Sequence, residues 1–592
     1  MKLDLTLSIK IGEAINALFS AVPENIQLQP TNPDFEGSHT LVCFPLLKLS
    51  KKKPEETAQL IGQWLLDNTN LISRFNVVKG FLNLVLRDQV WIEVFHAIQS
   101  DKNYGTLPSS GKEIMVEYSS PNTNKPLHLG HLRNNFLGWS VSAIYKAIGY
   151  EVHKVQIIND RGIHICKSMA AWQLFGNGDT PESSGLKGDK LVGKYYVEFD
   201  KQFKKEVKEL VDQGIPQEQA EKDSAIMKLA VDMLQMWEQK DADIVSLWKT
   251  MNGWVYKGFE STYHQMGVTF DKLYFESETY LLGKEEVLKG VEKGVFFKKD
   301  DGSVWVDLTA DGLDQKVLLR SDGTSVYMTQ DIGTAILRFR DFPKISRQVY
   351  TVGNEQEYHF KVLFLILAKL GYAWAKECYH LSYGMVDLPS GKMKSREGTV
   401  VDADDLMAEM IEEAEKQSRE LGKIDEVSEQ EAHKLFEMIG IGALKFYLLK
   451  VDPKKRMMFD PNESIQLQGH TGPFIQYTHA RIRSIVRKAA KMDISGDLNQ
   501  INSLMPNEQQ LINLLSIYPG RLQDAAKDYA PSIIANYAYD LAKEYNQFYQ
   551  SIPIFAEADQ SKLKLRVALS EKVADVLKKS IGLLGVEVPE RM

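Results

Sequence analysis

The pattern of hydrophobic and polar positions divides the chain into regions of different character. From about residue 111 to 400, short apolar runs alternate with amphipathic stretches, which is typical of a parallel α/β sheet. A charged, mostly helical stretch interrupts this alternation from about 172 to 260. Residues 1 to about 110 mix helical stretches with strand-like runs, and the pattern turns helical from about 401 almost to the end.

These regions predict a multidomain α/β protein with a Rossmann-type parallel-sheet domain at its centre. At 592 residues the chain is long enough for three or four hydrophobic cores. We expect an appended α+β domain, the Rossmann-type domain with its helical insertion, a helical connecting region and an all-α helical bundle, over residues 1–110, 111–400, 401–460 and 461–592.

A polar segment rich in turn residues follows the apolar strand expected at Ile114–Val116. It reads SSPNTNKPLHLGHLRNN over residues 119–135, and helical spacing of apolar side chains continues to a stop at Gly149. His128 and His131 therefore lie where a helix begins, and the unpaired N–H groups of a helix start suit phosphate. The short H-x-G-H box alone is equally compatible with zinc-binding or buried structural histidines.

A second basic segment lies far downstream, after the apolar run 380–389. Residues 390–399 read SGKMKSREGT, a glycine-flanked loop that carries three cations. On its own, such a charge run is usually a solvated turn. Together with the H-x-G-H box, we interpret it as a loop that closes over phosphates.

With both segments in view, the chain resembles a class I aminoacyl-tRNA synthetase, and within that class the arginyl-tRNA synthetase family. HLGH looks like the HIGH box of the class, and KMKSR looks like a degenerate KMSKS box. Further blocks extend the resemblance over nearly the whole chain, at 318–335, 352–360, 391–406, 472–485 and 589–592. The resemblance implies an arginine-tRNA ligase that converts arginine and ATP to arginyl-adenylate and diphosphate, then transfers arginine to the 3′ end of tRNA(Arg) and releases AMP.

The resemblance assigns the nucleotide chemistry to the two basic segments. It implies ATP with Mg²⁺ as a substrate complex, no tightly bound cofactor and no resident metal. The implied ATP contacts are His128, Leu129, Gly130, His131, Lys392, Met393 and Ser395, and the implied catalytic groups are His128, His131, Lys125, Lys392, Lys394 and Arg396. Ser395 stands where the second lysine of the box is expected. We expect Lys125, three residues before His128, to supply the missing charge, with Lys394 and Arg396 as rivals.

A pocket for arginine needs carboxylates, because a guanidinium is a planar, always charged fork of five donors. Glu117 ends the first strand, and Asp331 lies four residues after Tyr327 on one face of a predicted helix. The resemblance assigns the same three residues to the guanidinium. For the α-ammonium and carboxylate groups it implies Ser120, Asn122 and Gln356. A buried site of this kind rejects analogues without a guanidinium, and the 260 residues between His131 and Lys392 leave little room for an editing domain.

Only the resemblance says what the outer domains do. It implies that the N-terminal domain contacts the tRNA elbow through Phe81 and Asn83, and that the helical bundle reads the anticodon. It also implies that arginine activation requires bound tRNA. The bundle residues it indicates are Phe474, Tyr477, Arg481, Tyr549 and Met592. Phe474 stands where tyrosine is commoner, so it can stack on a base but lacks a hydroxyl. Packing in the bundle core is the alternative role for these aromatic residues.

Composition sets limits rather than identity. The net charge of −8 is unexpected for a protein that binds tRNA, but cations gather at 450–456 and 481–491, where they indicate either an RNA-facing surface or a solvated helix face. The longest apolar run, 362–375, is broken by Lys369 and too short to span a bilayer. The cysteines, Cys43, Cys166 and Cys378, are widely separated. We expect a cytoplasmic monomer whose partners are tRNA(Arg), L-arginine and ATP.

Two other functions remain open. One is a non-catalytic tRNA-binding paralogue that kept the fold, which failure to bind ATP would support. The other is a nucleotidyltransferase that uses an H-x-G-H box to build a dinucleotide cofactor, although the long helical C-terminal region would then have no role. Arginine-dependent product formation separates these alternatives.

Overall fold

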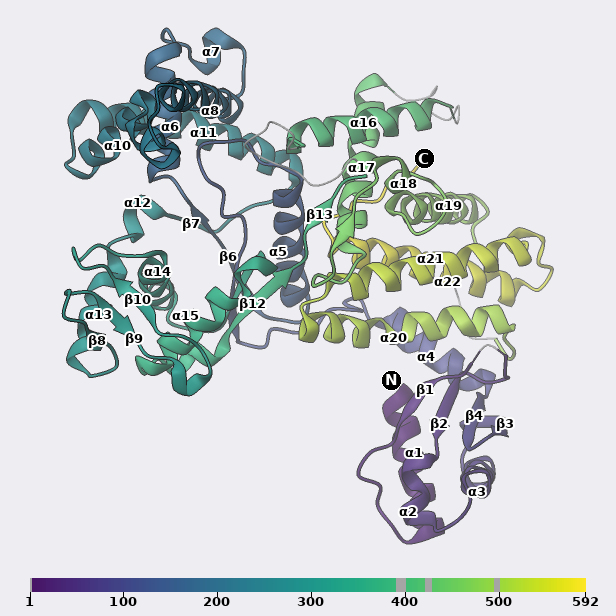
Figure 1. Ribbon diagram of the computed structural model, residues 1–592. Coiled ribbons are helices and arrows are strands. Elements are labelled where there is room, and N and C mark those ends of the chain that lie inside the picture. Colours follow the sequence, from purple (N-terminus) through teal and green to yellow (C-terminus); the bar gives the residue numbers. More distant parts are fainter. Residues whose placement is uncertain (1–2, 33, 390–400, 421–427, 495–500) are drawn as a thin grey trace.

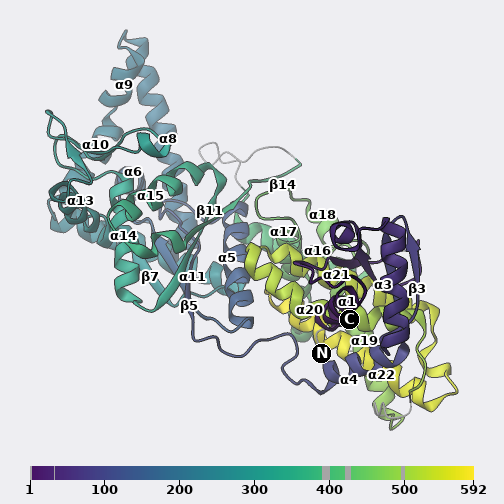
Figure 2. The ribbon, with the colours of Figure 1, turned by 90° about the horizontal axis from the view of Figure 1, so that it is seen from below.

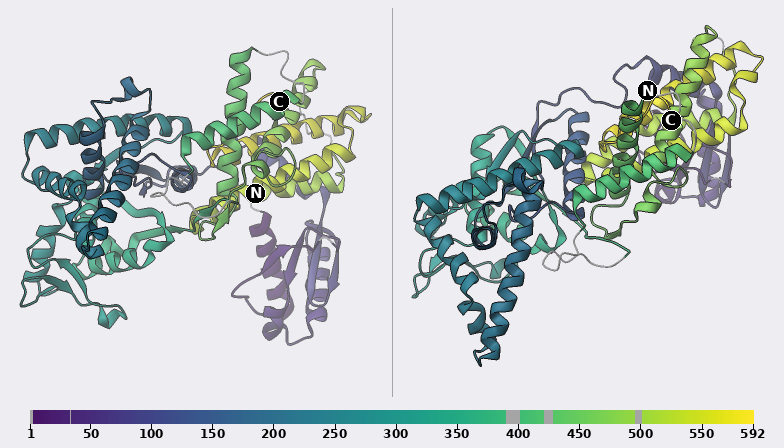
Figure 3. Two further views of the ribbon diagram at one scale, coloured as in Figure 1. Left: turned by 45° about the horizontal axis from the view of Figure 1, so that its top comes forward. Right: turned by 90° about the horizontal axis from the view of Figure 1, so that it is seen from above.

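The computed structural model describes residues 3–32, 34–389, 401–420, 428–494 and 501–592. Figure 1 shows an α/β part built around a sheet, a helical part beside it, and a small N-terminal unit that lies against the helical part. The further views in Figure 3 agree that the helical part stands between the other two. The predicted fold class, a parallel-sheet domain with an α+β unit and a helical bundle appended to it, is confirmed.

The N-terminal unit is a four-stranded antiparallel sheet of order β1-β2-β4-β3, packed against helices. Lys79 and Gly80 connect β3 to β4, and both have positive φ (47° and 82°), as a two-residue type I′ hairpin requires. The elements are α1 (Leu3–Phe19), β1 (Leu28–Pro30), β2 (His39–Val42), α2 (Leu47–Ser50), α3 (Pro54–Asn68), β3 (Ile72–Val78), β4 (Phe81–Leu86) and α4 (Asp88–Ser100).

The central sheet has five parallel strands in the order β12-β11-β5-β6-β7. Its strands are β5 (Glu113–Glu117), β6 (Glu151–Ile158), β7 (Lys272–Phe275), β11 (Ile345–Gly353) and β12 (Cys378–Tyr383). The chain builds outward from β5 to β7 and then returns to the other side of β5 for β11 and β12. Both faces are covered, so Ile114–Val116 at the centre is fully buried, as its unbroken apolar run predicts.

The predicted helical insertion lies between β6 and β7. It comprises α6 (Ile163–Phe175), α7 (Pro181–Ser184), α8 (Gly188–Asp212), α9 (Gln217–Asp223), α10 (Ala225–Glu238) and α11 (Ala242–Met266). Figure 2 shows α8 and α9 extending away from the sheet.

A second excursion, between β7 and β11, contains a three-stranded antiparallel sheet of order β10-β9-β8 that the sequence pattern did not reveal. Its turn carries Asp301-Gly302, a hairpin signal that could have indicated it. The elements here are α12 (Glu276–Thr279), α13 (Leu282–Glu292), β8 (Phe297–Lys298), β9 (Val304–Val306), β10 (Lys316–Leu319) and α14 (Tyr327–Asp341); α15 (Glu357–Lys369) then joins β11 to β12.

The C-terminal part is helical, as predicted. Its helices are α16 (Ala403–Glu420), α17 (Glu429–Leu449), α18 (Pro461–Ser464), α19 (Gly472–Lys491), α20 (Pro506–Asp528), α21 (Pro531–Ser551) and α22 (Gln560–Gly582). One short parallel pair, β13 (Val386–Asp387) with β14 (Met457–Met458), ties the end of the α/β part to the segment after α17.

Helix α5 (Leu129–Ala147) joins the sheet to the bundle. It stands between the two parts in Figure 1. On the bundle side, the Ser140 hydroxyl donates to Leu583 O at 2.7 Å and the Tyr145 hydroxyl donates to Ala526 O at 3.0 Å. The helix ends at a glycine, as predicted, since Gly149 has φ 90° just after it. None of the helices in the described ranges has the length and hydrophobicity of a bilayer span.

Candidate active site and RNA-binding surfaces

The carboxyl ends of the central strands gather polar side chains at one edge of the sheet. Glu117 ends β5, Asn159 follows β6, Glu276 follows β7, and residues 354–356 follow β11. In doubly wound sheets, ligands bind at this edge, at the point where the strand order reverses. Here that point lies between β5 and β11, which places the candidate site around Glu117.

The turn after β5 is held in a costly backbone conformation. Ser119 has φ 61°, which is uncommon for a residue other than glycine. Its N–H donates to Asn134 Oδ1 at 2.6 Å, and its hydroxyl shares a 2.7 Å hydrogen bond with the hydroxyl of Tyr263. Strain of this kind persists where the surroundings over-determine it. The turn that carries Ser120 and Asn122 is therefore fixed relative to α5.

The two histidines of the HLGH box lie at the start of α5, as predicted. His128 is the N-cap: its Nδ1 accepts the Gly130 N–H at 3.1 Å, and Nδ1 of His131 accepts the His128 N–H at 3.1 Å. Because each Nδ1 accepts, a neutral ring carries its proton on Nε2. Burial lowers the pKa of His128 to about 4 and the pKa of His131 well below its usual value, with Lys125 contributing to both shifts. Both rings are therefore neutral Nε2–H donors at pH 7, rather than cations.

Lys392, Met393, Lys394, Ser395 and Arg396 all lie outside the described residues. The chain that follows is anchored on the box, since Leu129 N–H donates to Val401 O at 3.2 Å and Ala403 N–H donates to Leu127 O at 2.9 Å. The described chain from residue 401 onward thus begins in backbone hydrogen bonds with the start of α5.

Glu117, which the resemblance assigns to the guanidinium of arginine, is buried and has an ion-pair partner within the protein. The side chain is 6% exposed and forms an ion pair with Arg338 of α14, which is 2% exposed. Burial raises the pKa of Glu117, and the adjacent Arg338 opposes that rise. The pairing is possible because Arg338 lies on the buried side of α14, which sequence spacing alone did not connect to β5. The other carboxylate oxygen lies 3.4 Å from the Ser120 hydroxyl.

Asp331 and Tyr327 lie one turn apart on α14, as the sequence predicts. Tyr327 is 77% exposed, so its ring is not part of the hydrophobic core. The Asp331 side chain is 40% exposed, and one of its oxygens lies 2.5 Å from Nε2 of His359 on α15. The negative charge of Asp331 contributes to the raised pKa of Glu117, so the two carboxylates lie near each other.

Sequence reasoning missed Glu276, the first residue after β7. Its carboxyl group is partly buried beside Arg161, Asp160 and Asp331, and burial raises its pKa to about 7. A raised pKa at the edge of the sheet where ligands bind marks a candidate site residue. The available signal was position, because Glu276 lies at the carboxyl end of a parallel strand, as Glu117 does.

Ser120, Asn122 and Gln356, which are assigned to the α-ammonium and carboxylate groups of arginine, are more exposed than Glu117. Asn122 is exposed and forms an isolated parallel bridge with Asn159, which holds it beside the end of β6. Gln356 is exposed in the turn after β11. Ser120, Asn122 and Gln356 therefore border the same sheet edge from the β5 and β11 sides.

On the bundle, the structure brings together three of the residues assigned to RNA. The guanidinium of Arg481 lies over the rings of Tyr477 (4.8 Å) and Tyr549 (5.3 Å), and it also donates to Asn546. Tyr549 is 39% exposed. Two aromatic rings held by a cation form a surface on which bases can stack.

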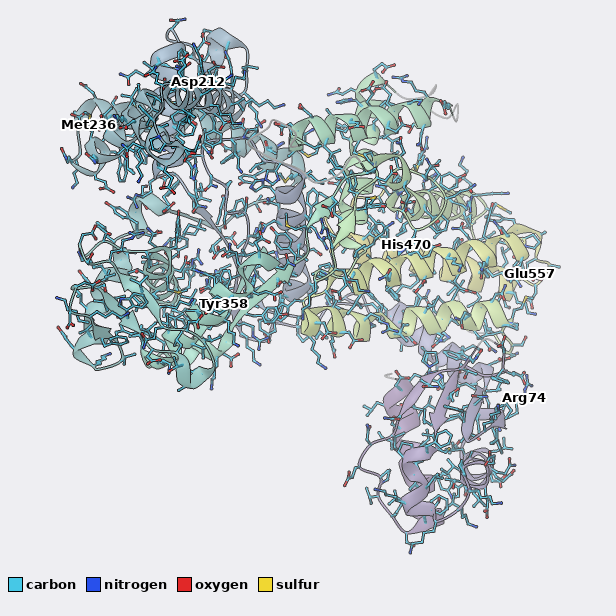
Figure 4. The ribbon with its side chains drawn as sticks, viewed as in Figure 1. Arg74, Asp212, Met236, Tyr358, His470 and Glu557 are labelled. Atoms are coloured by element: carbon cyan, nitrogen blue, oxygen red, sulfur yellow. The ribbon has the colours of Figure 1, made fainter. Side chains whose placement is uncertain are left out.

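Phe474 and Met592 are less accessible. Phe474 is partly buried beside Tyr539, with ring centres 5.5 Å apart, and Tyr539 in turn packs against His470 at 4.3 Å. Figure 4 shows His470 beside the helices of the bundle. Met592 is partly buried against the hydrophobic core. Phe474 thus makes the packing contact named as its alternative role, and base stacking by its ring stays a prediction.

Phe81 and Asn83, the two residues of the N-terminal unit assigned to RNA, differ in burial. Phe81 is partly exposed and meets Phe44 edge to face at 5.5 Å. Asn83, in contrast, is 2% exposed: its amide oxygen accepts the Thr40 hydroxyl at 2.6 Å and its amide nitrogen donates to Asn76 at 2.7 Å. Asn83 lies on the opposite face of β4 from the buried Leu82, Leu84 and Leu86, but its hydrogen bonds to the neighbouring strands β2 and β3 occupy its amide, so Asn83 does not present that amide to RNA.

The two basic clusters, at 450–456 and 481–491, differ in their contacts. Lys454, Lys455 and Arg456 are exposed after α17. On α19, Arg483 pairs with Glu590 at 2.8 Å and Arg487 donates to Glu590 O at 2.8 Å, so part of that cluster binds the C-terminal tail.

One group of described side chains could share a metal ion. Glu113, Glu151 and His153 offer ligand atoms that all lie within 4.8 Å of one another. They lie near the amino ends of β5 and β6, at the sheet edge opposite the candidate active site.

Three family models together match most of the chain. They are the catalytic domain of class I tRNA synthetases (R) over residues 93–460, the DALR anticodon binding domain over 475–592 and the arginyl tRNA synthetase N-terminal domain over 6–86.

Similar proteins agree over the full length. The arginine–tRNA ligase of Flavobacterium psychrophilum is 57% identical and that of Bacteroides thetaiotaomicron is 55% identical, with all of each chain covered. Among solved structures, the arginyl-tRNA synthetase of Thermus thermophilus matches with a TM-score of 0.76 at 23% identity, over 99% of both chains. That of Plasmodium falciparum has the same TM-score at 18% identity, over 100% of this chain and 99% of its own. The structural matches support the fold.

Proposed function

The chain belongs to the arginyl-tRNA synthetase family, and we propose that its reaction takes place at the sheet edge around Glu117 and the start of α5. The enzyme is an arginine–tRNA ligase. An arginine carboxylate oxygen attacks the α-phosphorus of ATP, and diphosphate leaves with the broken P–O bond. A hydroxyl of the terminal tRNA ribose then attacks the carbonyl carbon of arginyl-adenylate and displaces AMP. The alternative of a dinucleotide-forming enzyme does not explain the bundle.

Arginine is bound between α14 and the ends of β5 and β7. Asp331 and Tyr327 receive the guanidinium, and Glu276 adds a further carboxylate on that side. Glu117 shapes the pocket through its pair with Arg338 and offers its remaining oxygen beside Ser120. Asn122 and Gln356 hold the α-ammonium and carboxylate groups, which orients the attacking oxygen.

The phosphates are bound at the start of α5. His128 and His131 are neutral, so each gives an Nε2–H hydrogen bond to phosphate oxygens and adds no charge. Lys125 adds the cation that Ser395 does not provide, with Lys392, Lys394 and Arg396 as further donors from the second motif. ATP enters as its Mg²⁺ complex, whose charge offsets that of the phosphates. Catalysis is electrostatic and positional, with no covalent enzyme intermediate.

The outer parts bind tRNA. Residues 461–592 form the anticodon-binding domain, with Tyr477, Arg481 and Tyr549 as the stacking surface; Phe474 and Met592 border it. Residues 1–110 contact the elbow through Phe81, while Asn83 supports the sheet from inside. Residues 111–400 form the catalytic domain and 401–460 connect it to the bundle. We further propose that activation requires bound tRNA, and that the protein is a cytoplasmic monomer.

The single observation that carries this proposal is the pair of histidines at the start of α5, each with an Nδ1 that accepts a backbone N–H, on the same helix as Asn134, which holds the Ser119 turn. The test is transfer of labelled arginine to purified tRNA(Arg), with and without ATP. Acid-precipitable label that requires ATP supports the proposal. A folded protein that binds tRNA but neither binds ATP nor transfers label would support the non-catalytic paralogue.

A further inference from the structure

Arg133, on the second turn of α5, is a buried cation with an unusual set of partners. Its side chain is 1% exposed, and none of the described carboxylates forms an ion pair with it. Its guanidinium donates instead to backbone carbonyls: Nη1 to Gly384 O at 2.8 Å, and Nη2 to Pro453 O at 3.2 Å and Lys455 O at 3.0 Å. Each end of the planar fork thus reaches a different segment of chain.

The two segments that Arg133 joins are closely packed. Gly384 N–H donates to Pro453 O at 2.9 Å, and a Cβ added at Gly384 would lie 2.5 Å from the carbonyl carbon of Lys455. Two residues further along each segment, Val386 of β13 pairs with Met457 of β14. The junction therefore consists of backbone against backbone, with one side chain from α5 closing it.

Each side of this junction has a function in the proposed reaction. On one side, α5 carries His128 and His131 at its start, and Asn134, next to Arg133, holds the Ser119 turn. On the other side, the loop 452–456 exposes two lysines and an arginine. Exposed cations of this kind contact the phosphate backbone of nucleic acid.

We propose that Arg133 is a positioning residue that couples RNA contact at the loop 452–456 to ATP binding at the start of α5. This inference rests on the proposed function of both surfaces. A guanidinium in water loses little when one partner moves, but Arg133 is desolvated, so a shift of the carbonyls of 453–455 must carry Arg133 with it or leave its donors unpaired. Coupling of this kind is reciprocal: RNA tightens ATP binding by the same factor as ATP tightens RNA binding.

The test is the ratio of the ATP dissociation constants measured without and with saturating tRNA(Arg). For the unaltered enzyme we expect tRNA to tighten ATP binding by about 5-fold or more. Arg133→Lys keeps the charge, but an ammonium on a flexible stem cannot span both carbonyl groups as the planar fork does. We expect its ratio to fall to within about 2-fold of unity, while its affinity for tRNA alone and for ATP alone stays within about 3-fold of the unaltered enzyme.

Arg566→Lys is the matched control. Arg566 is also a buried arginine, 3% exposed, but it pairs with Glu508 and Glu557 inside the bundle, away from the junction. Its replacement should lower thermal stability and leave the ratio unchanged. If Arg133→Lys does not fold, Arg133→Gln takes its place, because its short neutral side chain likewise cannot span both carbonyl groups and buries no charge.

The proposal is overturned if the unaltered enzyme shows a ratio of one, or if Arg133→Lys, or Arg133→Gln in its place, keeps the full ratio. Equal loss of ATP affinity with and without tRNA would also overturn it, since that result means a merely structural role. Failure of the proposed function itself is distinguishable, because the unaltered enzyme would then not transfer arginine to tRNA at all.

Discussion

Replacing Glu117 with glutamine separates the structural role of this carboxylate from the substrate-binding role that we propose for it. Glu117 and Arg338 are 6% and 2% exposed, and Nε and Nη2 of Arg338 have no hydrogen-bond partner among the described residues. The rings of Tyr274 and Tyr350 lie 5.2 Å and 5.7 Å from the guanidinium but do not neutralise it. Glu117→Gln therefore leaves a buried positive charge without its counter-ion.

The size of the effect follows from this burial. Removing one partner of a buried ion pair costs about 3–5 kcal/mol. At roughly 2 °C per kcal/mol for a unit of this size, the apparent Tm of the catalytic part falls by about 6–10 °C. Replacing both residues, as Glu117→Gln with Arg338→Met, removes the stranded charge and should recover most of the loss. Arginine binding should not recover, because the pocket still lacks its carboxylate, and the KM for arginine should rise roughly 30-fold or more.

The assay is thermal unfolding of the single and double variants, followed by arginylation kinetics at saturating ATP and tRNA. Asp314→Asn is the control, since the same chemical change at an 87% exposed carboxylate should alter stability by no more than about 0.5 kcal/mol. The reasoning is refuted if Glu117→Gln costs less than about 1 kcal/mol, or if the two substitutions destabilise additively.

Four further outcomes are expected. Asp331→Asn should raise the KM for arginine by about 10-fold or more with a smaller effect on the KM for ATP, measured by steady-state kinetics. Lys125→Ala should slow tRNA-dependent adenylate formation by about 10²-fold or more, and near-normal activation would exclude its role. Arg481→Ala should weaken tRNA binding and flatten its dependence on salt, measured by titration at several salt concentrations. Burial lowers the pKa of His128 to about 4, so between about pH 4 and 6.5 this histidine binds a proton in the unfolded chain but not in the folded protein. The free energy of unfolding should therefore fall as the pH drops from about 6.5 toward about 4. In His128→Gln, the fall measured by unfolding at several pH values should be less steep.

The fold could be predicted from the sequence where local pattern decides it. The buried run Ile114–Val116, the helix that starts at His128 and the glycine that ends it are all short-range signals, and the structure has each of them. The small sheet β8–β10 was missed because its strands are two to four residues long, too short to show a period.

The residues of the candidate site could be predicted from the sequence, but the contacts between them could not. Spacing puts Tyr327 and Asp331 on one helix face, but it cannot show that Arg338, two turns further on, reaches Glu117 across the sheet. Burial likewise decided the role of Asn83, whose amide is bonded to Thr40 and Asn76 of the neighbouring strands, and the position of Glu276 became apparent only once β7 was placed beside β6. Long-range contacts of this kind depend on tertiary packing, which a single sequence does not encode as a local pattern.

The most direct test of the account is AMP release from ATP on charging purified total tRNA, with each of the twenty amino acids offered separately and every trial repeated without tRNA. The account predicts a signal with arginine alone, and only when tRNA is present. Signal with a different amino acid, or none with arginine, would contradict it.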